Sequence, residues 1–143
     1  MGKRHKAREI VLQGLYQYEI GKKDLQDILL FDWINKKRVP LEILLFAEEL
    51  LRGTIQNLTI IDKLIKKNLD NWDFNKISAI DRNILRFSTF SIIFQLEIPF
   101  IVTINEAIDI ARKFGGEQSF RFVNGVLDGI LKEINLKKHS INN

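Results

Sequence analysis

The sequence predicts an all-helical protein, and three observations support this fold class. Apolar residues recur at three- and four-residue spacing along most of the 143 residues, which is the period of an amphipathic helix. Helix-start and helix-stop signals divide these stretches into short segments. Evidence for strands is thin, because the β-branched run at 98–104 contains Pro99 and precedes a capping signature. We expect an extended connection there.

Composition limits the classes of protein that remain. The chain is 45% hydrophobic and 28% charged, enough to form the core of one domain or of two small subdomains that share an interface. It contains no cysteine, no signal-peptide pattern and no apolar run of membrane-spanning length. We therefore expect a soluble, cytoplasmic protein with no membrane partner. The net charge is only +4, so the distribution of the charges matters more than their total.

The first expected helix combines a buried stripe with a cluster of cations at its start. The apolar stripe consists of Ala7, Val11, Leu15 and Tyr18. The cluster consists of Lys3, Arg4, His5, Lys6 and Arg8. Cations at a helix N-terminus are repelled by the positive end of the helix dipole. An external anion, such as a nucleic-acid phosphate, would offset this repulsion. Gln13 and Tyr16 could join the same surface, whereas a solvated basic tail is the alternative.

Two further helices are expected in the first half of the chain. After a stop at Gly21, residues 24–35 have the pattern of a short amphipathic helix. Pro40 then opens a helix of about 28 residues, judged from a heptad pattern that continues without interruption. Its repeating positions are Leu44, Leu51, Leu58 and Ile65. We expect this helix to form the spine of the fold.

A helix from Ala79 to about Gln95 should be central, because it is apolar on most sides. Ser78 followed by Asp81 is a capping signature that predicts its start. Asp81 also gathers with Arg82 and Arg86 near that start. These three side chains form either a local ion pair or a charged patch that faces a partner.

Residues 102–128 have the pattern of two helices separated by a glycine stop. Thr103 with Glu106 predicts a capping box and a helix start near Ile104, and Gly115-Gly116 predicts its end. The second helix has an apolar stripe that consists of Phe120, Val123, Leu127, Ile130, Leu131 and Ile134.

Phe122 lies off that stripe, about 120° from its centre in a regular helix, beside Arg121. An exposed aromatic ring next to a guanidinium is suited to stacking an unpaired base. The alternative is that Phe122 packs under a neighbouring helix. Gly125 and Gly129, one turn apart, would leave a strip where another backbone could approach closely.

The sequence shows no pattern of a catalytic or metal site. The only histidines, His5 and His139, lie near opposite ends of the chain, and no glycine-rich phosphate loop is present. We therefore expect a binding protein that is not an enzyme and that holds no metal.

Two segments carry a resemblance to a known family. They are KRHKAREIVLQGLY, from Lys3 to Tyr16, and INEAIDIARKFGGEQSFRFVNGVLD, from Ile104 to Asp128. Over essentially its full length the chain resembles the NusB family of bacterial transcription antitermination factors. The resemblance implies one compact domain of about six to seven helices in two small bundles, with no cofactor. These would span residues 1–75 and 76–136, followed by a tail at 137–143.

The resemblance also implies a function. Such proteins bind the single-stranded boxA element of ribosomal RNA operons together with NusE, a small-subunit ribosomal protein. The complex joins the elongating RNA polymerase and other Nus factors in the bacterial cytoplasm, suppresses termination and supports rRNA synthesis. The RNA-binding residues it implies are Lys3, Arg4, Lys6, Arg8, Gln13, Ser119, Arg121, Phe122 and Asn124. The NusE-facing residues it implies are Tyr16, Asp81, Arg82 and Arg86.

A protein of a different class remains an alternative. The chain could be a protein–protein adaptor that contacts RNA only incidentally. It could also be a self-associating scaffold, since some members of the family form homodimers.

Overall fold

The computed structural model describes the backbone of residues 2–142 and the side chains of residues 2–137. The helices are α1 (Lys3–Glu19), α2 (Leu25–Ile28), η1 (Lys36–Arg38), α3 (Leu41–Gln56), α4 (Leu58–Lys67), α5 (Ala79–Phe94), α6 (Phe100–Gly115) and α7 (Glu117–Asn142). No strand occurs within residues 2–142, so the all-helical prediction is confirmed. None of these helices has both the length and the apolar character needed to cross a bilayer. The backbone stays helical to Asn142, where a tail was expected, and the side chain of His139 lies outside the described residues.

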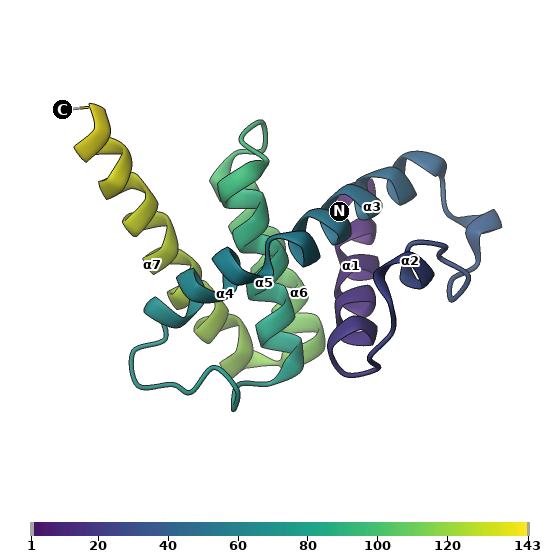
Figure 1. Ribbon diagram of the computed structural model, residues 1–143, viewed down its shortest axis with the longest axis horizontal. Helices are drawn as coiled ribbons and strands as arrows, with labels where there is room; N and C mark the ends of the chain where they lie inside the picture. Colours follow the sequence, from purple (N-terminus) through teal and green to yellow (C-terminus); the bar gives the residue numbers. More distant parts are fainter. Residues whose placement is uncertain (1, 143) are drawn as a thin grey trace.

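Helix α5 is central, as its sequence predicts. It packs against α1, α3, α4, α6 and α7, and Figure 1 shows α1 and α7 on opposite sides of it. Every residue from 82 to 92 is buried, because neighbours cover this helix all round. Its start is the predicted one: the Ser78 hydroxyl accepts a hydrogen bond from the amide of Asp81 at 3.1 Å.

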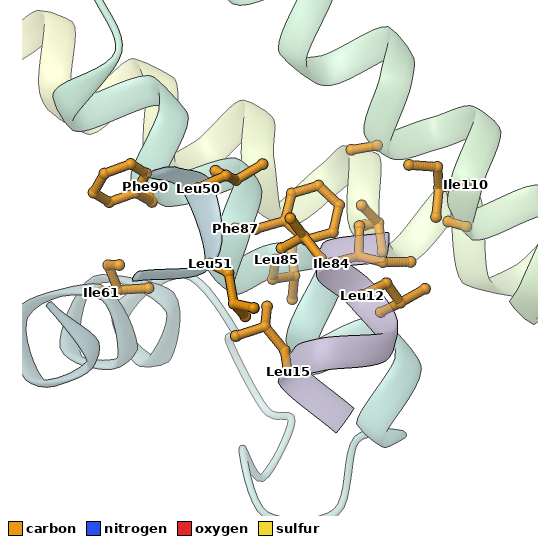
Figure 2. Packing of buried hydrophobic residues seen from close by; sticks show 14 of the residues in the cluster. Leu12, Leu15, Leu50, Leu51, Ile61, Ile84, Leu85, Phe87, Phe90 and Ile110 are labelled. Carbon is orange, nitrogen blue, oxygen red and sulfur yellow. The ribbon is translucent and has the colours of Figure 1, made fainter. Parts of the chain in front are cut away.

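The core is built where α1, α3 and α6 meet α5. The side chains that fill it include Leu12, Leu15, Leu50, Leu51, Ile84, Leu85, Phe87 and Ile110 (Figure 2). Burying each of these side chains stabilises the fold by about 1.5–3 kcal/mol. Gly53 of α3 allows a close contact here, since a Cβ at this position would collide with the ring of Phe90 in α5. The two helices therefore touch through backbone and ring.

The single long helix predicted after Pro40 is wrong. Helix α3 ends at Gln56 and α4 begins at Leu58, because the backbone of Asn57 leaves the helical conformation (φ −117°, ψ 20°). The Asn57 side chain donates to the carbonyl oxygen of Gly53 at 2.7 Å, which is how asparagine competes with helical hydrogen bonds. The heptad pattern did not reveal this break, because Leu51 and Ile65 are buried on either side of it.

The helix predicted at residues 24–35 is much shorter. Asp24 caps α2 by accepting the amide of Gln26 at 3.3 Å, but α2 ends at Ile28. The backbone of Phe31 then takes a positive φ of 54°, which no helix can contain. Trp33 donates its indole N–H to the carbonyl oxygen of Ile28 at 3.0 Å and folds the segment back on itself.

The capping box predicted at Thr103 and Glu106 is also wrong, as is the extended connection before it. Helix α6 begins at Phe100, directly after Pro99, whose fixed φ suits a helix start. Thr103 is therefore buried inside the helix, and Glu106 reaches His5 of α1. The predicted end is confirmed, since Gly116 adopts a φ of 89°, which favours glycine.

Candidate nucleic-acid interface

The start of α1 presents most of its predicted RNA-binding residues to solvent. Lys3, Arg4, Lys6 and Gln13 are all exposed. Lys3 pairs with Glu42 of α3, and the guanidinium of Arg4 lies 4.5 Å from the centre of the Phe46 ring. Lys6 and Gln13 share a groove with Asn35 and Arg38. The periodicity of α1 gave no signal for those last two residues, because they come from a different segment.

Arg8 lies beneath this surface. It is only 2% exposed, and its guanidinium lies 5.4 Å from the Phe46 ring of α3 and 4.0 Å from the Glu106 carboxylate of α6. Burial lowers the pKa of Arg8, Glu106 opposes that shift, and Arg4 adds to it. In this position Arg8 joins three helices and does not reach a ligand at the surface.

The last turn of α6 lies beside α1. Lys113 donates to the carboxylate of Glu9 at 2.7 Å, and its own side chain is exposed. His5 lies between Glu9 at 3.2 Å and Glu106 at 2.6 Å. Arg112 is exposed next to Lys113. The structure brings this arginine and lysine between α1 and α7, a position that no motif in the sequence indicates.

The start of α7 extends the same surface. Arg121 and Asn124 are exposed, and the guanidinium of Arg112 lies 4.2 Å from the centre of the Phe120 ring. Phe122 is half-buried and meets Trp72 edge-to-face, with ring centres 5.4 Å apart. Both interpretations of Phe122 therefore hold in part, since the ring packs on a neighbour and keeps an exposed portion.

Ser119, a predicted RNA-binding residue, is buried. Its hydroxyl donates to the carboxylate of Asp81, which was predicted to face a protein partner. A Cβ at Gly115 would collide with this hydroxyl, so glycine there permits the contact. In the structure Ser119 and Asp81 join α7 to α5.

The predicted partner-facing residues divide in a similar way. Tyr16 is 46% exposed, whereas Arg82 and Arg86 are each only 8% exposed. Arg82 donates to Glu19 of α1 at 2.7 and 2.9 Å. Arg86 donates to Asp62 of α4 at 2.9 and 3.0 Å and to Glu19 at 2.9 Å. The ion-pair alternative describes these arginines best, but their partners come from distant helices and not from the local sequence.

These close contacts set the ionisation of the cluster. Burial by itself would raise the pKa of Glu19, but the hydrogen bonds and charges of Arg82 and Arg86 outweigh it and lower that pKa. Burial would likewise lower the pKa of Arg86, but Asp62 and Glu19 outweigh it and raise that pKa. Both shifts favour the charged forms of Glu19 and Arg86.

The glycine strip of α7 is partly covered by the protein itself. A Cβ at Gly129 would lie 2.6 Å from the side-chain oxygen of Asn68, which directly follows α4, so glycine there serves internal packing. A Cβ at Gly125 would meet no atom within 4 Å. Among the residues with described side chains, no group of three His, Asp or Glu is arranged to hold a metal ion.

Comparison with known proteins identifies the family. Residues 5–132 match the model of the NusB family. A transcription antitermination protein NusB from Thermodesulfovibrio yellowstonii is 42% identical, with 92% of this chain and 93% of the relative covered. The protein of the same name from Treponema denticola is 40% identical, with 89% and 94% covered.

Solved structures agree with this assignment. T. maritima NusB is 40% identical and superposes with a TM-score of 0.83, and 91% of each chain is covered. A structure of antitermination factors NusB and NusE in complex with double-stranded RNA superposes with a TM-score of 0.79, covering 93% of this chain and 98% of that one. At 23% identity that second likeness concerns the fold alone. The chain belongs to the NusB family.

Proposed function

We propose that this chain is a transcription antitermination factor that binds single-stranded boxA RNA of ribosomal RNA operons together with NusE. Family membership supports the proposal, since the curated relatives are named transcription antitermination proteins. A fold relative forms a complex with NusE and double-stranded RNA, which supports NusE and RNA as the partners. The protein acts by binding and not by catalysis. It works in the bacterial cytoplasm, on the elongating RNA polymerase with other Nus factors.

One observation carries the RNA-binding part of the proposal. Exposed cations follow one another from the start of α1, over the last turn of α6, to the start of α7. We call the following set the RNA surface: Lys3, Arg4, Lys6, Gln13, Arg112, Lys113, Arg121, Phe122 and Asn124. The Lys113–Glu9 pair and the contact of Arg112 with Phe120 join its three parts. Arg8 and Ser119 support this surface from beneath, and neither is a direct contact in our proposal.

The chemistry of the RNA surface fits a single strand. Lysine and arginine bind backbone phosphates and supply salt-dependent affinity without sequence preference. Phe122 and the amides of Gln13 and Asn124 can stack on bases and bond their edges, which are accessible only in unpaired RNA. We assign Tyr16 to the NusE contact because it is exposed, whereas Asp81, Arg82 and Arg86 hold the surrounding helices in place.

Fluorescence anisotropy of a labelled boxA-like RNA, titrated with the protein at two salt concentrations, tests the proposal. We expect binding that is weak alone, stronger with NusE, weaker at high salt and weaker for a scrambled sequence of equal length. Equal and weak binding to both RNAs, with NusE still bound tightly, would contradict it. That outcome would instead identify a protein–protein adaptor.

A further inference from the structure

A groove beside α7 lies at the edge of the RNA surface and contains a large exposed aromatic side chain. Its volume is about 410 Å³, and its walls include Trp72, Lys76, Ile77, Gln118, Arg121 and Phe122. Trp72 and Lys76 belong to the connection between α4 and α5, and the other wall comes from the first turns of α7. Neither periodicity nor a motif in the sequence marks Trp72 as a binding residue.

We propose that this groove holds one unpaired nucleotide of the bound RNA, with Trp72 as a second stacking residue beside Phe122. The inference rests on the proposed function, because it places part of the same RNA strand. It adds a binding residue on a segment that contributes nothing else to the RNA surface.

The position and exposure of Trp72 carry the argument. The side chain is 63% exposed, although an indole is among the largest apolar groups in a protein. It is nevertheless held in place, because its ring meets Phe122 edge-to-face at 5.4 Å and an interplanar angle of 65°. The backbone amide of Trp72 also donates to the carbonyl oxygen of Leu69 at 2.9 Å. A fixed indole with an open face is suited to stack a base of any type.

The charges around the groove select the kind of occupant. Lys76 and Arg121 stand on opposite walls, and within the described part of the chain neither forms an ion pair. Asp81 also lines the groove, but its carboxylate accepts the hydroxyl of Ser119. Two available cations beside two aromatic rings complement a nucleotide, whose base is planar and whose phosphate is negative. An aliphatic side chain of a protein partner would use the rings and leave the cations unmatched.

The two tryptophans of the chain make a direct experiment available. In the variant Trp33→Phe, Trp72 is the only tryptophan, so its fluorescence reports on the groove. Titration with a single-stranded boxA-like oligoribonucleotide should quench this fluorescence with the same midpoint as the anisotropy of labelled RNA. The matched control is Trp72→Phe. Its remaining tryptophan, Trp33, is half-buried and donates its indole N–H to the carbonyl oxygen of Ile28, so RNA should quench its fluorescence far less than that of Trp72.

Affinity measurements complete the test. Trp72→Ala should weaken RNA binding about five- to 150-fold, which corresponds to the 1–3 kcal/mol of one stacked base. Trp72→Phe retains an aromatic face and should retain most of the affinity. An oligonucleotide that lacks the base proposed to stack on Trp72 should bind Trp72→Ala and the unmodified protein with equal affinity. Circular dichroism confirms that each variant is folded.

The outcomes separate this inference from the proposed function. If RNA binds normally while Trp72 is not quenched and Trp72→Ala has full affinity, the groove inference is wrong and the proposed function stands. If Trp72→Ala weakens only the binding of NusE, the groove holds a protein side chain and the inference is also wrong. If the unmodified protein binds no RNA at all, with or without NusE, the proposed function itself fails.

Discussion

The two ends of α1 carry charged residues that are used in opposite ways. At its end, Glu19 meets Arg82 and Arg86 in a buried cluster, where the two arginines donate to its carboxylate at 2.7–2.9 Å. At its start, Lys3 and Lys6 remain exposed, and even the paired Lys3 keeps two thirds of its side chain in solvent. Arginine suits the first environment because its planar fork binds carboxylates at two points. Only the second set leaves its charge available to a ligand.

The comparison shows why a cluster of charges in a sequence does not identify a binding surface. Arg82 and Arg86 carry the same positive charge as Lys6, and the family resemblance assigned all three to external partners. Burial separates them, since an arginine that is fully bonded inside the fold cannot also contact a second molecule. Substitutions at the two ends of α1 should therefore have different consequences.

The largest effect is expected for Arg86→Ala. The substitution leaves Asp62 without its partner and removes one of the two arginines bonded to Glu19. Removing one partner of a buried ion pair destabilises a protein by about 3–5 kcal/mol. Urea denaturation followed by circular dichroism measures this loss. A variant that keeps its stability but loses NusE binding would show that Arg86 belongs to an interface.

Glu19→Gln should have an effect that depends on pH. The pKa of Glu19 is lowered in the folded protein, so its contribution to stability is fully present above the unfolded pKa of about 4.3 and is lost as the pH falls through the folded value. The difference in unfolding free energy between Glu19→Gln and the unmodified protein should be largest at pH 7 and should shrink as the pH falls below about 4. Urea denaturation at several pH values measures it. A difference that is constant with pH would mean that the charge of Glu19 is not what stabilises the cluster.

The smallest effect is expected for Lys6→Ala. Its side chain is exposed, so the change should alter stability by less than about 0.5 kcal/mol. If Lys6 contacts one phosphate of a single strand, the slope of log affinity against log salt concentration should fall by about 0.7. Anisotropy titrations over a salt series measure the slope, and Lys23→Ala, outside the RNA surface, is the matched control. An unchanged slope would remove Lys6 from the RNA surface.

Much of the fold could be predicted from the sequence, because local signals determine it. The extent of α1, the Ser78 cap of α5 and the end of α6 at Gly116 follow from periodicity and capping. The break at Asn57 could not be predicted, since the apolar pattern continues across it. The start of α6 was misplaced because Thr103 imitates a cap while Pro99 provides the real start.

The candidate site was less predictable, since its parts come together only in three dimensions. Periodicity indicated that Phe122 leaves the buried stripe, but it could not show that Trp72 lies against this ring. The sequence likewise gave no sign that Arg112 and Lys113 fill the space between α1 and α7. Contacts between residues far apart in the chain decide these placements, and one sequence does not report them.

The absence of a side chain at Gly53 has a consequence for how the whole chain unfolds. The ring of Phe90 occupies the space that a side chain at position 53 would need. Without α5, the apolar face of α3 would therefore be left with a gap at Gly53. The helices before residue 75 therefore depend on the helices after it for part of their interior. We expect the two halves to melt in one cooperative step, and neither half to be an autonomous folding unit.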